Sequence, residues 1–462
     1  MLKKKMIRDI RKNLSQFVTI FLMVAIGVMA YTGIEAYMSG MQYTADKFYS
    51  ENNLQDLNVM GENFTNEDLD KIKSIDNVKD AERKLSLTGT TDNNKTLLLN
   101  FIETNNISKF YVIDGEPFKE NESGVWLDNF YAKENNIKVG DKILVKYEKM
   151  NLTETVKGLI NVPDHVKDES QIYPDRKDFG FAYLSINEIP ESYIKEKAME
   201  KAGIKDEQIF DQCVKDFNYK DYYIFNYIMV DVDNKDEIND VKNNIEDNVK
   251  NALAIINIED TASYRTYQGE VDEGKTYVGV FSGLFLFIAM LSVITTMTRV
   301  VSKQRIQIGT LKALGFKKSK ILLHYIGYGF WISLFASIAG IIIGYFGIGK
   351  TFINLEMSFF EVPNGTAKIV PSSYLVAGAV VFAVSFITYL TCRSILKENA
   401  AETLRNKLPN VKEKSINITT KGIFKKMGFS SKWNLRDILR NKMRTFMGIA
   451  GVTGCAMLIV CA

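Results

Sequence analysis

Four long runs without a charged residue constrain this chain more than any other feature. A membrane-spanning helix needs about 20 predominantly apolar residues to cross a ~30 Å hydrocarbon core. The runs are 18, 23, 29 and 21 residues long, and a fifth run of 18 residues ends the sequence. A water-soluble single-domain enzyme is therefore excluded. The runs span residues 17–34, 276–298, 321–349, 372–392 and 445–462.

The averages of the 462 residues conceal this pattern. A mean hydropathy of −0.08 and a net charge of +3 are typical of a soluble protein. Residues 38–275 alone carry 29 Lys/Arg and 47 acids, a net charge of −18. The first run follows a basic start, as in a signal peptide, but its length and the absence of an A-x-A site favour a retained helix. The fifth run stops with the sequence, so we expect a fragment of a longer protein.

The basic residues predict an orientation. Loops rich in Lys and Arg stay cytoplasmic. Residues 1–13 carry six Lys/Arg and one acid, residues 299–320 carry seven and none, and residues 392–445 carry fourteen and four. We therefore predict a cytoplasmic N-terminus, a polar domain outside and a plasma-membrane location. The basic patches lie next to predicted membrane spans, and this position explains them more simply than nucleic-acid binding does.

The outside region predicts an α+β domain. Leu57–Met60, a helix capped by Thr65, and an extended Val78–Thr88 form a β-α-β unit. A strand at Ile224–Val232 and a helix at Asp236–Val249 repeat the pattern after a strand-rich insertion. Only one of the four cysteines, Cys213, lies in this domain, so no internal disulfide can form there. We expect residues 260–275 to form a helical stalk.

Catalytic and cofactor motifs are weak. Gly344–Thr351 fits the phosphate-binding pattern G-x-x-x-x-G-K-[ST], but it ends a membrane run on the predicted outer side. His165 lies in a polar outer loop beside Asp164, Asp168 and Glu169, which favours a solvated loop over a weak cation site, and His324 lies near the inner end of a membrane run, as a functional group or as a neutral residue near the headgroups. No Ser/His/Asp or Cys/His set can be placed together from the sequence. We expect no catalytic residue, metal or cofactor in this chain. Small residues instead predict close helix packing, at Gly279, Gly283, Ala336, Gly340 and Gly344.

An internal repeat precedes two of the apolar runs. Residues 7–13, I-R-D-I-R-K-N, recur as residues 435–441, L-R-D-I-L-R-N. Ile7, Ile10 and Leu14 are predicted on one helical face and the basic residues on the other, as in a helix lying on the inner membrane surface. Parallel repeats are common in transporters.

The loop at residues 305–316 predicts a docking site. Gly315 is a natural helix stop. Ile308, Leu311 and Leu314 place an apolar side on a short helix that faces the cytoplasm, which indicates a partner or a resting place on lipid headgroups. Residues 308–315, I-G-T-L-K-A-L-G, resemble the E-I-G-x-L-K-A-L-G segment of the FtsX/MacB-type permeases of ABC transporters, with Gln307 where that family has Glu. Residues 401–405 and 136–142 are similar to two weaker motifs of the same family.

The resemblance implies a permease subunit without its own ATPase, a multi-pass α-helical membrane protein with a large extracytoplasmic α+β domain of the MacB-like periplasmic-core type. Its partners would be a cytoplasmic ABC ATP-binding protein, which uses the ATP, and membrane lipids, with a second permease copy or a missing second half left open. The resemblance also implies mechanotransmission, in which movement driven by the ATPase passes through the membrane helices and exports or extracts a lipid-like or peptide-like substrate. The ATPase-coupling residues would be Arg305, Ile308, Gly309, Leu311, Lys312, Ala313, Leu314, Gly315 and Phe316.

Two alternatives to export stay open. One is a transmembrane signalling subunit that regulates a cell-wall hydrolase or senses antimicrobial peptides, and the other is a membrane-anchored enzyme. The predicted segments are a cytoplasmic amphipathic helix (1–14), transmembrane helix 1 (15–37), the outside domain with its stalk (38–275), transmembrane helix 2 (276–298), the coupling loop (299–320), transmembrane helix 3 (321–349), an outer loop (350–371), transmembrane helix 4 (372–392), a linker with the second-repeat helix (393–445), and truncated transmembrane helix 5 (446–462).

Overall fold

The computed structural model describes residues 2–167, 177–214 and 218–397, with the isolated positions 428, 449 and 453. The predicted linker, second-repeat helix and fifth membrane helix lie outside the described residues. The chain divides into two compact units. The helical unit comprises Met1–Gly40, Asp272–Ile353 and Ala367–Ala462, and the α+β unit comprises Met41–Val271 and Asn354–Thr366.

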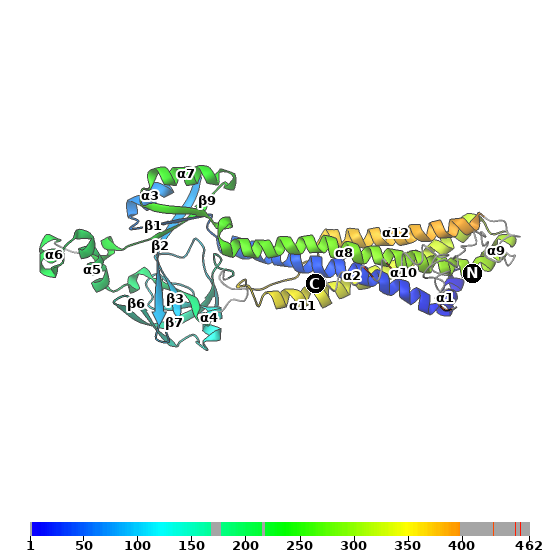
Figure 1. Ribbon diagram of the computed structural model, residues 1–462, viewed down its shortest axis with the longest axis horizontal. Helices are drawn as coiled ribbons and strands as arrows, with labels where there is room; N and C mark the ends of the chain where they lie inside the picture. Colours follow the sequence, from blue (N-terminus) through cyan, green and yellow to red (C-terminus); the bar gives the residue numbers. More distant parts are fainter. Residues whose placement is uncertain are drawn as a thin grey trace. The chain divides into compact units, whose positions relative to one another are not determined.

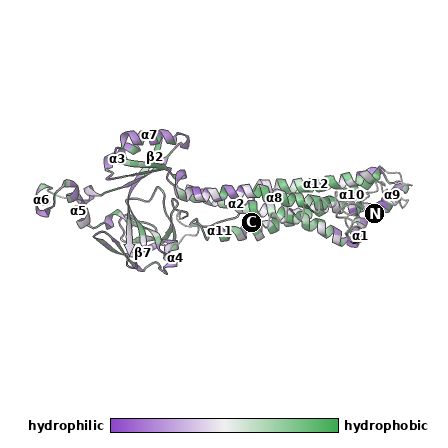
Figure 2. Cartoon of the chain, in the orientation of Figure 1, coloured by the Kyte–Doolittle hydropathy of each residue, from purple (hydrophilic) through white to green (hydrophobic). Residues whose placement is uncertain are grey.

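The helical unit is built from long apolar helices, which Figure 2 shows as largely hydrophobic ribbons. Among the described residues, four helical stretches are long and apolar enough to cross a membrane: Leu14–Glu51, Ala262–Lys303, Lys318–Glu356 and Pro371–Arg393. Two short helices accompany them. The elements are α1 (Leu2–Lys12), α2 (Leu14–Glu51), α8 (Ala262–Lys303), α9 (Arg305–Ala313), α10 (Lys318–Ile343), a π-helical turn (Gly344–Gly349), α11 (Lys350–Glu356) and α12 (Pro371–Leu396).

All four long helical stretches extend beyond the predicted membrane segments, and two of them change the predicted organisation. α2 continues to Glu51, 14 residues past the predicted end at Tyr37. The third membrane helix continues through the π turn into α11. The first seven residues of the predicted outer loop 350–371 are therefore helical, since no proline or helix-stop glycine interrupts them.

The helical unit has its own apolar core. Phe17 and Val28 of α2, Tyr328 and Ala336 of α10, and Val384 of α12 are buried in one cluster. Phe17 stacks on Tyr328 with ring centroids 5.6 Å apart. Gly340 and Gly344 allow α10 and the turn after it to approach α2 closely.

The α+β unit contains one ten-stranded sheet in the order β10-β1-β9-β2-β3-β8-β5-β7-β4, with β6 pairing β2 and β7. Its first four strands are antiparallel to their neighbours. With α3 and α7 they form a β-α-β-β-α-β, or ferredoxin-like, arrangement, and Figure 1 shows both helices at that end of the sheet. The four strands are β1 (Leu57–Gly61), β2 (Val78–Thr91), β9 (Tyr227–Val232) and β10 (Ala252–Asn257), and the helices are α3 (Asn66–Lys73) and α7 (Ile238–Asn248).

An insertion separates the two halves of this arrangement, as predicted. A second core cluster lies within it, in which Trp126 is fully buried and donates its indole N–H to the Glu116 carbonyl at 2.8 Å. The insertion consists of β3 (Thr96–Ile102), β4 (Tyr111–Gly115), β5 (Val125–Asp128), α4 (Asn129–Glu134), β6 (Lys142–Tyr147), β7 (Met150–Asn161), β8 (Phe179–Ser185), α5 (Glu191–Ala202) and α6 (Glu207–Cys213), with short 3₁₀ turns at Ile186–Glu188 and Tyr219–Tyr222. Two further 3₁₀ turns lie outside the insertion, at Lys235–Glu237 before α7 and at Ile258–Asp260 after β10.

The N-terminal cap predicted at Thr65 is confirmed. The Thr65 hydroxyl accepts the N–H of Asp68, and the Asp68 carboxylate accepts the N–H of Thr65. This reciprocal capping box satisfies two of the unpaired donors at the start of α3. Ile72 of the same helix is fully buried against the sheet.

Candidate functional site

The predicted docking loop forms a short helix, α9, that is closed at both ends by tight turns. At its C-terminal end Gly315 adopts φ +82°, a left-handed conformation that favours glycine. The N–H of Phe316 donates to the Leu311 carbonyl and that of Gly315 to the Lys312 carbonyl, both at 3.1 Å. This is a Schellman motif, which stops the helix and redirects the chain into α10.

The two apolar sides of α9 have different environments. Ile308 is fully buried in the core cluster of the helical unit, and Gly309 is buried beside it. Leu311 and Phe316 pack partly against the same cluster. The expectation that Ile308, Leu311 and Leu314 share one exposed side is therefore wrong, because the first two anchor α9 to the membrane helices.

The exposed side of α9 is defined by four residues, Ile306, Thr310, Ala313 and Leu314, which we call the outer α9 face. Ile306 is 51% exposed and Leu314 is 69% exposed. The four residues follow helical spacing and therefore lie on one side of the helix. Ile306, which the sequence analysis did not single out, is the member of this face that a period-3.6 count from Leu314 would have found.

Charged residues hold and surround α9. The Lys312 ammonium donates to the Leu396 carbonyl at the end of α12, at 3.1 Å. Arg305 is half-buried, and Lys317, Lys318 and Lys320 are exposed. No acid occurs between residues 299 and 320. The outer α9 face is therefore an apolar patch with cations beside it, which suits an acidic rim around an apolar pocket on a partner.

The small residues predicted for helix packing divide into two groups. A Cβ built on Gly340 would lie 2.7 Å from the Ala25 carbonyl oxygen, and one on Gly344 would lie 2.7 Å from that of Met29. Ala336, one turn earlier, is fully buried. α2 and α10 thus approach to backbone contact along this stripe.

The other two glycines, on α8, have no such contact. Nothing among the described residues lies within 4 Å of a Cβ built on Gly279 or Gly283. The packing role predicted for these two residues is therefore not seen in this part of the structure. A G-x-x-x-G spacing is permissive for close packing and does not by itself supply a partner helix.

The phosphate-loop pattern at Gly344–Thr351 is helical. Residues 344–349 form the π turn, and Lys350 starts α11 with its ammonium 5.0 Å from the centre of the Phe346 ring. A phosphate-binding loop requires backbone N–H groups that do not already donate to carbonyl groups within a helix. The pattern therefore has no phosphate-binding geometry here. The π turn itself, a feature often found at functional sites, was not predicted.

The two histidines belong to different units, His165 to the α+β unit and His324 to the helical unit. His165 stacks on Phe181 with ring centroids 4.3 Å apart and lies 4.0 Å from the Asp164 carboxylate. His324 lies 3.3 Å from the Tyr328 hydroxyl. Within the described residues, no group of three or more His, Cys, Asp or Glu side chains could hold a metal ion.

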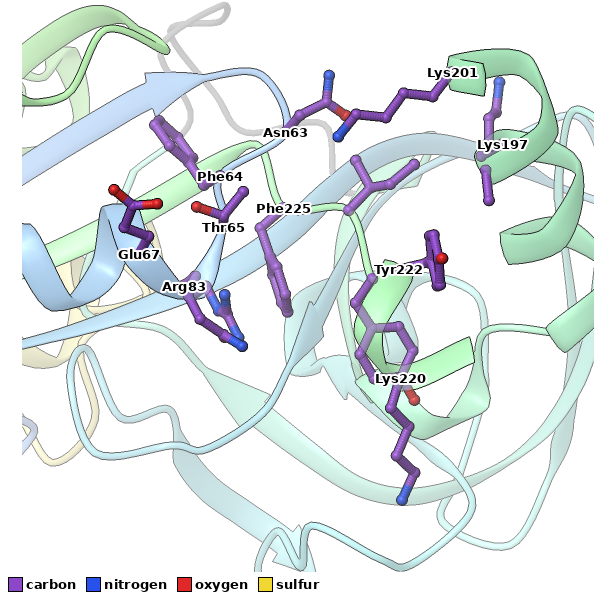
Figure 3. A pocket seen from close by; sticks show the side chains of 14 residues that line it. Asn63, Phe64, Thr65, Glu67, Arg83, Lys197, Lys201, Lys220, Tyr222 and Phe225 are labelled. Carbon is purple, nitrogen blue, oxygen red and sulfur yellow. The ribbon is translucent and has the colours of Figure 1, made fainter. Parts of the chain in front are cut away.

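The α+β unit carries a pocket of about 320 Å³ beside the start of α3, between that helix and α5. Figure 3 shows cationic and aromatic side chains around it. The Arg83 guanidinium is fixed there by both oxygens of Glu103, at 2.9 and 3.1 Å, and by the Phe225 ring beneath it. The pocket lining includes Arg83, Lys197, Lys201 and Lys220 and one acid, Glu67. Because Arg83 pairs with Glu103 and Lys197 pairs with Glu148 and Glu200, Lys201 and Lys220 are the lining cations available to an anionic group among the described residues.

These features define the protein as a helical membrane protein that has an α+β unit and a short helix within a basic loop. Residues 279–400 match the family model described as FtsX-like permease C-terminal. This segment, which contains α9, α10 and α12, is similar to the C-terminal domain of FtsX-like permeases. The resemblance predicted from residues 308–315 is confirmed for that part of the chain.

Two solved structures are similar to this chain at low identity. One is the extracellular domain of the ABC-type transporter YknZ from Gram-positive bacteria, with 15% identity, a TM-score of 0.27, and 44% of this chain and 97% of that chain covered. The other is the periplasmic region of MacB from Actinobacillus actinomycetemcomitans, with 10% identity, a TM-score of 0.28, and coverages of 48% and 95%. No curated protein matches this chain.

Proposed function

We propose that this chain is the permease subunit of an ABC transporter and that the outer α9 face docks on a separate cytoplasmic ATPase. The observation that carries the proposal is the apolar, cation-flanked outer α9 face inside an FtsX-like permease domain. An exposed apolar patch on a helix that is anchored from behind suits a protein partner. ATP would then be used by that partner, and this chain would need no cofactor of its own.

The positive-inside rule supports the orientation that docking requires. Residues 299–320, which contain α9, carry seven Lys/Arg and no acid, whereas residues 38–275 carry 18 more acids than bases. α9 would face the cytoplasm and the α+β unit would lie outside. Closure of the ATPase would move α9, and Ile308 and Lys312 would pass that movement to the helix bundle.

The test measures ATP hydrolysis by the cognate ATPase with the full chain in nanodiscs. Leu314→Asp and Ile306→Asp each place a charge on the outer α9 face, and we expect each to lower stimulation at least tenfold. The matched control is Leu253→Asp in the α+β unit, where Leu253 is 74% exposed, and stimulation should stay within twofold. Unchanged stimulation in both α9 variants would refute the docking surface.

We propose a lipid-like or peptide-like substrate, moved by mechanotransmission through the membrane helices. The cationic lining of the pocket beside α3 favours a substrate with an anionic group. A signalling subunit that acts on a cell-wall hydrolase or senses antimicrobial peptides is the alternative. ATP-dependent flux of substrate in proteoliposomes supports transport, whereas ATPase stimulation without flux supports signalling.

A further inference from the structure

α1 has two sides of different chemistry, and its single acid lies on the inner one. Asp9 is 5% exposed and accepts hydrogen bonds from the Lys5 ammonium and, at 3.0 Å, from the Tyr328 hydroxyl of α10. Asn13 donates its side-chain amide to the Asp9 carbonyl at 3.1 Å. The predicted apolar side of Ile7, Ile10 and Leu14 is wrong, because Ile10 packs inward with Met6.

The outer side of α1 combines two apolar residues with three cations. Ile7 and Leu14 are more than half exposed, and Arg8, Arg11 and Lys12 are exposed beside them. Of the described carboxylates, none pairs with these three cations. Helical spacing places Ile7, Arg8, Arg11 and Lys12 within one half of the circumference of α1, and Leu14 follows as the first residue of α2. We call these five residues the outer α1 face.

The position of α1 decides what can cover this face. α1 ends at Lys12 and the first membrane helix starts at Leu14, so the outer α1 face lies where apolar helix surface begins. Apolar side chains and unpaired cations on one face match the acyl chains and phosphates of a leaflet. A zwitterionic headgroup would offset the cations with its own amine, whereas an anionic headgroup would not.

We propose that the outer α1 face is a binding site for anionic phospholipid and that the Asp9–Tyr328 hydrogen bond orients it. With Asp9 turned inward, the face presents three positive charges and no negative one to the lipid. Without that bond, α1 could rotate and bring a carboxylate toward the headgroups. The same Asp and Asn spacing recurs at Asp437 and Asn441.

The experiment measures binding of phosphatidylglycerol and phosphatidylcholine to the full chain in detergent micelles by native mass spectrometry. Each interfacial cation contributes about fivefold to the binding of anionic lipid. We therefore expect the triple variant Arg8→Gln/Arg11→Gln/Lys12→Gln to lower affinity for phosphatidylglycerol about a hundredfold and to leave phosphatidylcholine unchanged. The matched control removes three cations of the α+β unit outside the pocket lining, Lys205→Gln/Lys242→Gln/Lys250→Gln, and should leave the lipid preference intact.

Tyr328→Phe separates the orienting effect of the Asp9–Tyr328 hydrogen bond from the effect of the cations. It changes no charge and keeps the ring that stacks on Phe17. We expect it to lower the preference for phosphatidylglycerol severalfold, with an unchanged melting profile as the check on folding. Equal binding of both lipids by the wild-type chain, or an unchanged preference in the triple variant, would overturn the site. An unchanged preference in Tyr328→Phe would overturn the orienting role of the bond.

Discussion

Single residues decide how closely the helices of this protein approach and where its buried charges are tolerated. Gly340 and Gly344 leave room for the α2 backbone, and Asp9 and Asp164 are acids buried with named partners. The sequence predicts the glycines from their spacing. It does not predict the partners of the acids, because Tyr328 and Lys84 come from distant parts of the chain.

Gly340→Ala should destabilise the helical unit by about 1–3 kcal/mol, because a methyl group would lie 2.7 Å from a backbone oxygen that cannot move independently. Gly279→Ala is the matched control, since nothing among the described residues lies within 4 Å of its new methyl group. Thermal unfolding of the full chain in detergent measures both. Equal melting temperatures for the two variants would contradict the packing described here.

Asp164 makes the stability of the α+β unit depend on pH. Burial favours its protonated form, but His165, Lys84 and the Gln55 hydrogen bond outweigh burial and hold the pKa of this carboxyl below its usual range. A lowered folded pKa stabilises the unit above the unfolded pKa of about 3.9, and the stabilisation is lost as pH falls through the folded value. The protection of the β2 amides against hydrogen exchange, relative to the unfolded chain at the same pH, should therefore fall below about pH 4.

Asp164→Asn should remove much of this acid sensitivity. It should also lower stability at pH 7 by about 3–5 kcal/mol, because it leaves the Lys84 ammonium buried without a counter-ion. Asp92→Asn breaks an exposed ion pair with Lys146 and serves as the control, with an expected change below about 1 kcal/mol. Equal exchange rates in the two variants would contradict a stabilising role for the buried pair.

At the scale of elements, periodicity predicts which segments are helical or extended but not which face is buried. The helix at α9 was expected, yet both of its sides are apolar, so sequence alone could not tell that Ile308 faces the bundle and Leu314 faces outward. The strands at β1, β2 and β9 were predicted from their apolar patterns. Their order was not, because strand pairing depends on contacts more than 100 residues apart.

Elements inside the insertion were predicted less completely. β8 was missed, although Phe179–Ser185 is an apolar run, because no turn residues of a recognised hairpin precede it. It pairs in parallel with β3, whose residues lie about 80 positions earlier. Parallel strands are joined by a long crossover and not by a tight turn, so no short turn sequence marks the pair. The π turn at Gly344–Gly349 likewise has no pattern that separates it from an ordinary helix.

At the scale of the whole molecule, charge distribution predicts which parts share a compartment. We expect the α+β unit outside and α9 inside. A membrane-impermeant maleimide should therefore label the exposed Cys213 in intact cells. A cysteine introduced by Leu314→Cys, with Cys213, Cys455 and Cys461 replaced by serine, should react only after permeabilisation. Labelling of position 314 in intact cells would contradict the orientation.

Photocrosslinking measures directly whether the outer α9 face contacts an ATPase. A photoreactive amino acid is placed at position 314, at buried position 308, or at position 253 of the α+β unit, and the full chain is irradiated with the cognate ATPase. We expect a crosslinked permease–ATPase product at 314 and none at 308 or 253. Absence of the product at 314, or equal yields at all three positions, would contradict the account.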